Sequence, residues 1–168
     1  NNTIVGNVSV GDLPSGVAVN PAGTRVYVSN LGSGSISVSD IGSNTVVATV
    51  TGLGTAPYGV TVSPDGGRVY ATNWTSNTVS VIDTATNTVV GSAISVGKNP
   101  QGIAINPAGT RVYTSNRGDG SVSVIDTATN TLVGTYKVGT QPFDVAISPD
   151  GARLYVSDLA GGASGTVT

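Results

Sequence analysis

The chain has 168 residues, of which 38% are hydrophobic and only 10% are charged, and its formal net charge is −2. It contains no His, Cys or Glu, which excludes Ser-His-Asp and Cys-His catalysis, disulfides and thiolate metal sites. The acidic balance argues against nucleic acid as a partner, and no apolar run is long enough for membrane insertion. Because Val, Thr and Ile occur in a background rich in Gly, Asn and Ser, we expect an all-β protein.

From residue 14 onward the chain consists of four copies of one unit. Proline recurs at 14, 57, 100 and 142, so the copies are 43, 43 and 42 residues apart. A period near 43 that contains four short strand patterns is typical of β-propeller blades. We therefore predict one domain over residues 1–168, with repeats at about 14–56, 57–99, 100–141, and 142–168 plus 1–13.

Each copy shows the same order of strands and turns. The first strands are expected at 16–20, 58–62, 101–105 and 143–147, and the second at 25–30, 68–73, 111–116 and 153–158. The third are expected at 35–40, 78–83 and 121–126, and the fourth at 45–50, 88–96 and 131–138. The turns NPAG and SPDG link the first strand to the second, with Pro and Gly placed as in a type I turn.

The two ends of the chain indicate how the propeller closes. The fourth copy reaches only the start of a third strand at 165–168, whereas residues 2–6 (NTIVG) match the opening of a fourth strand at 87–91 (NTVVG). We expect the N-terminal strand to complete the last blade, which gives a closed ring of four blades, each with four antiparallel strands. Two alternatives stay open: strand exchange between chains into an eight-bladed dimer, and self-association through terminal strands along a polymer.

The hairpin between the second and third strands fixes a set of cross-strand pairs. With a four-residue loop after Asn30, Arg25 falls opposite Asp40 in the antiparallel register. The same count predicts three structural ion pairs, which are Arg25–Asp40, Arg68–Asp83 and Arg111–Asp126. Arg153 would need a partner near position 171, beyond the last residue.

One tetrapeptide pattern carries a resemblance to a known family. The sequences YVSN, YATN, YTSN and YVSD each follow a Pro-x-Gly turn and Arg-Val or Arg-Leu. They resemble the YVTN-type β-propeller repeat of archaeal and bacterial cell-surface and surface-layer proteins. The resemblance implies a propeller fold and a location outside the cell or at its surface. Members usually carry more blades, commonly seven.

Residues that break the repeat mark the face at which a ligand is expected. In propellers that face is formed by the loops before the first strand and after the second, near the central channel. We predict that it binds a protein or a glycan through Tyr58, Trp74, Gln101, Arg117, Asp119, Phe143 and Asp144. The aromatic side chains can form a patch for such a ligand, or they can instead plug the top of the channel.

Three further patterns fit the composition without a special role. Arg117-Gly118-Asp119 spells RGD at a loop tip, and Asn1, Asn7 and Asn73 begin glycosylation triplets. Asp12 and Asp144 would approach each other at the mouth of a closed channel, where oxygen ligands suit Ca²⁺ or Mg²⁺. We expect no cofactor and no metal.

These observations favour a non-catalytic propeller, extracellular or at the cell surface, that acts as a structural, adhesive or protein-interaction scaffold. One alternative is an enzyme, since some related propellers are lactonases or lyases. Those usually use His or Glu at the channel, whereas this chain offers only Asp as a base and Tyr as an acid. The other alternative is a repeat fragment or an engineered ring without activity of its own.

Overall fold

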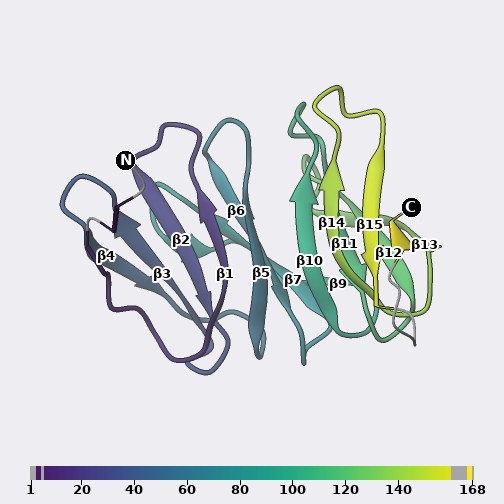
Figure 1. Ribbon diagram of the computed structural model, residues 1–168, viewed down its shortest axis with the longest axis horizontal. Helices are drawn as coiled ribbons and strands as arrows, with labels where there is room; N and C mark the ends of the chain where they lie inside the picture. The colour runs from purple at the N-terminus through teal and green to yellow at the C-terminus, as the bar shows by residue number, and fades with distance from the viewer. Residues whose placement is uncertain (1–2, 5, 160–165, 168) are drawn as a thin grey trace.

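A computed structural model describes residues 3–4, 6–159 and 166–167, and the described residues form sixteen strands and no helix (Figure 1). The strands make four antiparallel sheets that follow one another along the chain. Each sheet is one copy of the sequence repeat, so the all-β propeller blades are confirmed. Nothing in the described part of the chain is a helix with the length and hydrophobicity needed to cross a membrane.

The strands of each sheet pair in chain order. The first sheet contains β1 (Pro14–Val19), β2 (Arg25–Asn30), β3 (Ser35–Asp40) and β4 (Thr45–Val50). The second contains β5 (Pro57–Val62), β6 (Arg68–Asn73), β7 (Thr78–Asp83), and both β8 (Thr88–Val89) and β9 (Ile94–Ser95) paired to β7. The third contains β10 (Pro100–Ile105), β11 (Arg111–Asn116), β12 (Ser121–Asp126) and β13 (Thr131–Lys137). The fourth contains β14 (Pro142–Ile147), β15 (Leu154–Asp158) and β16 (Thr166–Val167).

The observed strands differ from the expected ones at two places. Each first strand begins at its proline, because Pro14 pairs with Asn30 before a bulge brings Val17 opposite Val28. The strand expected at 88–96 is divided into β8 and β9, since Gly91 takes a φ of +65° that interrupts the extended backbone.

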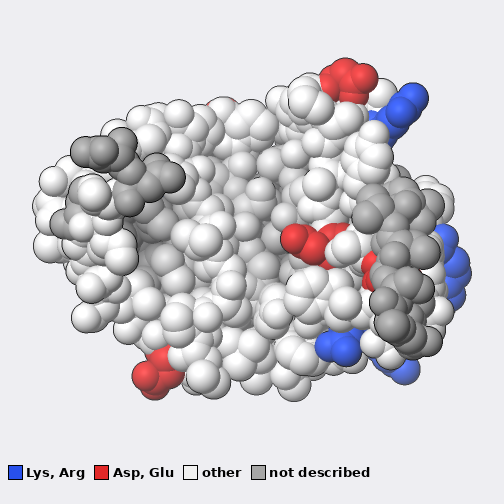
Figure 2. All heavy atoms as spheres, viewed as in Figure 1, with Lys and Arg blue, Asp and Glu red and all other residues white. Residues whose placement is uncertain are grey.

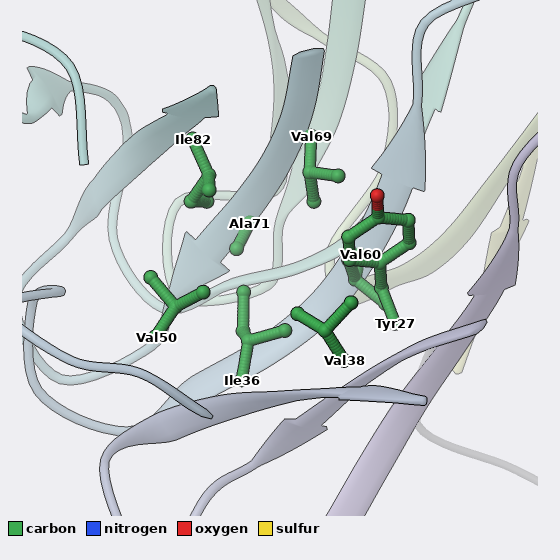
Figure 3. Packing of buried hydrophobic residues seen from close by; sticks show 8 residues of the cluster. All are labelled: Tyr27, Ile36, Val38, Val50, Val60, Val69, Ala71 and Ile82. Atoms are coloured by element: carbon green, nitrogen blue, oxygen red, sulfur yellow. The ribbon is translucent and has the colours of Figure 1, made fainter. Parts of the chain in front are cut away.

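Apolar side chains fill the spaces between neighbouring blades. Figure 3 shows the cluster between the first and second blades, where Tyr27 and Val38 lie beside Val60 and Val69. Similar clusters join the second blade to the third and the third to the fourth. Burying one such aliphatic side chain stabilises the fold by about 1.5–3 kcal/mol. Each blade therefore depends on its neighbours for most of its core.

The expected closure of a four-bladed ring is not what the structure shows. The described residues before Gly11 lie in no strand, and the chain enters beside the first sheet, where a Cβ on Gly6 would lie 2.6 Å from the side chain of Asn44. Figure 1 shows the first and fourth sheets at opposite ends of the molecule. Val17 on the outer face of the first blade is 68% exposed, so no fourth blade covers it. The described residues form an arc of four blades, and none of the described residues of the N-terminal segment pairs with β14, β15 or β16. Residues 2 and 5 of the strand expected at 2–6 lie outside the described residues.

Candidate binding face

The innermost strands β1, β5, β10 and β14 stand side by side across the middle of Figure 1 and form one wall. A hollow of about 400 Å³ runs along this wall. Its lining repeats the same three positions in every blade, which are residues 15–17, 58–60, 101–103 and 143–145. Figure 2, seen from the same direction, shows that this side of the molecule is mostly uncharged. Tyr58, Gln101, Phe143 and Asp144 of the predicted face therefore share the wall.

Glycine allows neighbouring inner strands to approach each other closely. A Cβ on Gly16 would lie 2.5 Å from the carbonyl oxygen of Tyr58 in the next blade, and Gly59 and Gly102 are as tightly enclosed. The fourth blade has Asp144 at this position, and its side chain is exposed. An acidic group thus stands at the end of an otherwise uncharged wall.

A side-chain hydroxyl couples each blade to the next. Thr72 Oγ1 accepts the N–H of Gly59 at 2.8 Å and donates to the carbonyl oxygen of Gln101 at 2.9 Å. The other two junctions have the same two bonds, through Ser29 from Gly16 to Tyr58 and through Ser115 from Gly102 to Phe143. All three hydroxyl residues are buried. Our sequence reasoning did not select them, although a hydroxyl residue at this place in all four copies was a usable signal.

Two predicted residues form an aromatic pair on the loop face, which is the side of the molecule formed by the loops before the first strands and after the second strands. The rings of Tyr58 and Trp74 meet edge to face, with centroids 5.7 Å apart and planes at 83°. Trp74 also lines a second hollow, of about 330 Å³, together with Asn99, Arg117, Gly118, Thr140 and Gln141. Arg117 Nη2 donates a hydrogen bond to Gln141 Oε1 at 3.3 Å. Sequence reasoning missed Asn99, and the signal was its position in the loop that enters β10.

Two other predicted residues are engaged within the fold. The carboxylate of Asp119 accepts the N–H of Lys98 at 2.6 Å, and its carbonyl oxygen accepts a hydrogen bond from the Lys137 ammonium. The carboxylate of the RGD sequence is thus held within the loops. Gln101 is only 1% exposed, and among the described residues its Oε1 finds no hydrogen-bond donor. The structure therefore brings Tyr58, Trp74 and Arg117 together as an open site, and it leaves Gln101 and Asp119 outside it.

The Arg–Asp pairs lie at the other end of the hairpins, away from the loop face. Arg68 Nη1 and Asp83 Oδ2 are 2.5 Å apart, and Asp83 Oδ1 also accepts the N–H groups of Ala85 and Thr86 at 2.9 and 3.1 Å. The hydrogen bond from Thr86 N–H is the main reason why the pKa of Asp83 lies below its usual value, and Arg68 contributes less. The other two pairs repeat the arrangement, as Arg25–Asp40 and Arg111–Asp126. Such partly exposed pairs, repeated in three blades, are part of the scaffold.

On the described residues, the structure gives no support to the metal pattern or to the glycosylation triplet at Asn73. Within residues 3–4, 6–159 and 166–167, no three His, Cys, Asp or Glu side chains gather into a metal site. Asp12 and Asp144 belong to the blades at opposite ends of the molecule, so the approach expected for a closed channel is absent. Asn73 is fully buried and donates to the hydroxyls of Thr78 and Ser80, which blocks a sugar there. Asn7 is exposed, and the triplet at Asn1 falls outside the described residues.

The chain closely resembles about half of larger solved structures. It superposes with a TM-score of 0.88 on a chain of Kuenenia stuttgartiensis hydrazine synthase, at 30% identity, covering 99% of this chain and 48% of that one. A functionally unknown protein from Desulfotomaculum acetoxidans DSM 771 gives a TM-score of 0.75 at 19% identity, over 92% of this chain and 54% of that one. The second likeness shows the fold alone. The chain thus spans about half the length of these two structures, and it superposes on them as an arc of blades.

The sequence itself also matches a family of proteins. No curated protein matches the chain. The family model described as lactonase, 7-bladed β-propeller, matches residues 2–91 and 88–167. These two matches together cover nearly every residue and all four blades. The chain therefore belongs to the lactonase family of seven-bladed β-propellers.

Proposed function

We propose that this chain is a non-catalytic recognition scaffold, located outside the cell or at its surface, and that its loop face binds a glycan. The hollow beside Trp74 carries the proposal, because it combines an aromatic wall with amide and guanidinium groups. The likeness of the repeat to YVTN-type cell-surface proteins supports the location. A protein partner is the other ligand that such a face suits.

The chemistry of the hollow matches that of a sugar ring. A pyranose has an apolar C–H face that packs on an indole, and its edge carries hydroxyl groups that seek hydrogen bonds. Trp74 supplies the flat surface, and Tyr58 fixes the indole with an edge contact of a kind worth about 0.5–1.5 kcal/mol. Arg117, Asn99 and Gln141 supply donors and acceptors around it.

Trp74 is the only Trp in the chain, so its fluorescence reports directly on this hollow. We would titrate the protein with neutral oligosaccharides of glucose, mannose and N-acetylglucosamine, and probe a glycan array in parallel. A saturable change in emission is expected, and Trp74→Ala should abolish binding on the array. The matched control is Tyr136→Ala, which removes a 58% exposed aromatic side chain from β13. Binding that survives Trp74→Ala, or that requires Tyr136 equally, would contradict the proposal.

A lactonase-type enzyme is the second candidate, and the family match favours it. Asp144 places an exposed carboxylate on the channel wall, where it can act as a general base on water, and Tyr58 lines the same hollow. The test is to offer the protein a panel of γ- and δ-lactones and to measure their hydrolysis from the acid released at constant pH. Turnover above the buffer rate that Asp144→Asn removes would replace the non-catalytic proposal with this one.

A further inference from the structure

Trp74 and Arg117 occupy the same place in neighbouring blades, directly after the second strand. The N–H of Trp74 donates to the carbonyl oxygen of Ala56 at 2.9 Å, and the N–H of Arg117 donates to that of Asn99 at 3.1 Å. The first and fourth blades make the same bond, from Leu31 to Leu13 and from Leu159 to Gln141. The scaffold therefore accepts different side chains at this place. Because Trp74 and Arg117 line one hollow, it combines an aromatic surface with a cation.

The seven cationic residues of the chain fall into two groups. One arginine precedes or begins each second strand, and three of these four arginines form the ion pairs of the scaffold. The other three cations are Lys98, Arg117 and Lys137, and all of them lie at the loop face of the third blade. Among the described residues, none of these three forms an ion pair. The second group is therefore not explained by the scaffold.

The carboxylates nearest to these cations are bound to the backbone and lie outside the hollow. The carboxylate of Asp119 accepts the N–H of Lys98 at 2.6 Å. Asp158 is 6% exposed, and its carboxylate accepts the N–H groups of Thr140 and Gln141 at 2.7 and 3.1 Å. Within the part of the chain that the structure describes, the lining of the hollow contains one guanidinium and no carboxylate. The hollow is thus a positively charged spot on a protein of net charge −2.

The guanidinium of Arg117 keeps most of its hydrogen-bonding capacity. It offers five N–H donors in a planar fork, and only Nη2 is engaged, with Gln141 Oε1 at 3.3 Å. That distance is longer than the usual 2.9–3.0 Å, so the amide orients the guanidinium without binding it strongly. The fork matches the two oxygens of a carboxylate, which it binds through two parallel hydrogen bonds.

We propose that the glycan bound at this hollow is acidic, and that it presents the carboxylate of a uronic acid to Arg117. This inference rests on the glycan site of the proposed function and names its ligand class. In the pyranose form of a uronic acid, the carboxylate extends from the edge of the ring. A ring that stacks on Trp74 therefore directs its carboxylate along the wall of the hollow, where Arg117 supplies the matching donors. Lys98 and Lys137 lie beside the hollow and attract a polyanion toward it.

Pairs of ligands that differ only in charge test this inference. The ligands are short oligomers of galacturonate, glucuronate and mannuronate, each compared with its methyl ester, which keeps the ring and removes the charge. Isothermal titration calorimetry gives the dissociation constants of both. We expect at least one of the acids to bind about tenfold or more tightly than its ester at low salt. The difference should shrink as the salt concentration rises, because salt screens exposed charges.

Arg117→Gln should remove the preference for the acid and leave the affinity for the ester unchanged. The matched control is Arg153→Gln, which makes the same change in net charge at an exposed site just before β15. Trp74→Ala should abolish binding of both ligands. An equal loss of acid binding in Arg117→Gln and Arg153→Gln would overturn the inference, since net charge alone would then explain the preference.

The same titrations separate this inference from the proposed function. If acid and ester bind equally well, or if only neutral oligosaccharides bind, the glycan site stands and the role of Arg117 is wrong. If no oligosaccharide binds, whether neutral or acidic, the proposed glycan site fails and the inference fails with it. Dextran sulfate and single-stranded DNA are the remaining ligands. Binding of either one as tightly as the best uronate would show attraction to any polyanion and would overturn the assignment to uronic acids.

Discussion

The Thr72 hydroxyl donates a hydrogen bond to the carbonyl oxygen of Gln101, 2.9 Å away, and so ties the second blade to the third. Thr72→Val keeps the shape of the side chain but leaves this carbonyl and the N–H of Gly59 without their buried partner. We expect a loss of about 1–3 kcal/mol in the free energy of unfolding, measured by urea denaturation. The exposed Thr75→Val is the control, and an equal loss there would contradict the assignment.

Gly59→Ala tests the close approach of the inner strands. Its Cβ would overlap the backbone of Gln101 and would also press on Ile103 and Thr72. Because backbone must move to relieve the overlap, we expect a loss of about 1–3 kcal/mol or more in unfolding free energy. Gly67→Ala is the matched control, since its nearest neighbour is the Asp65 carboxylate at an ordinary 3.4 Å. Equal melting temperatures for the two variants would show that the inner strands are not tightly packed.

The turn aspartates predict a loss of stability in acid. Hydrogen bonds from backbone N–H groups lower the pKa of Asp83, and the same cause lowers those of Asp40 and Asp126. A carboxyl with a lowered folded pKa contributes stability that is fully present above its unfolded pKa, near 3.9. That contribution disappears as pH falls through the folded pKa. Melting temperature should therefore fall below about pH 4, and the difference between wild type and Asp83→Asn should shrink there. A constant difference from pH 7 to pH 2 would show that the charge of Asp83 contributes nothing.

Ile82→Ala tests the core between the first and second blades. Ile82 is fully buried in that cluster, and its truncation leaves a cavity between sheets that are held by their β-strand hydrogen bonds. We expect a loss of about 2–5 kcal/mol in unfolding free energy. The exposed Ile41→Ala should change it by less than about 0.5 kcal/mol. If the two variants have equal melting temperatures, the cluster does not stabilise the arc of blades.

Local features of the fold were predictable because the same sequence pattern occurs in several copies of the repeat. Register follows from loop length, so Arg68 opposite Asp83 could be counted from a four-residue loop. The turn between the first and second strands was equally predictable, since Pro and Gly fix its backbone. In the structure, the N–H of Gly66 donates to the Ser63 carbonyl at 2.8 Å in this turn. The meeting of Tyr58 and Trp74 followed in outline from placing both on the loop face.

Closure and ligand chemistry were not predictable in the same way. Whether four blades close into a ring depends on the volume of the side chains between the sheets and on how closely neighbouring inner strands approach each other. Neither quantity can be read from the sequence of a single repeat. Asp144 was selected because it breaks the repeat, whereas its structural effect comes from the Cβ that its three glycine counterparts lack. Gln141 and Asn99 join the hollow beside Trp74 only because loops of different blades converge there.

The hydrogen bonds that the hydroxyls of Ser29, Thr72 and Ser115 make between blades (the hydroxyl bridges) have a consequence for how the molecule unfolds locally. Each of them links one blade only to the next, so stability spreads along the arc as nearest-neighbour coupling, as in a linear array of repeats. A blade held on both sides must break two sets of bridges to open, and a terminal blade must break one. Backbone amides in β14 and β15 should therefore exchange with solvent well before those in β6 and β7, and fraying should proceed inward from the ends.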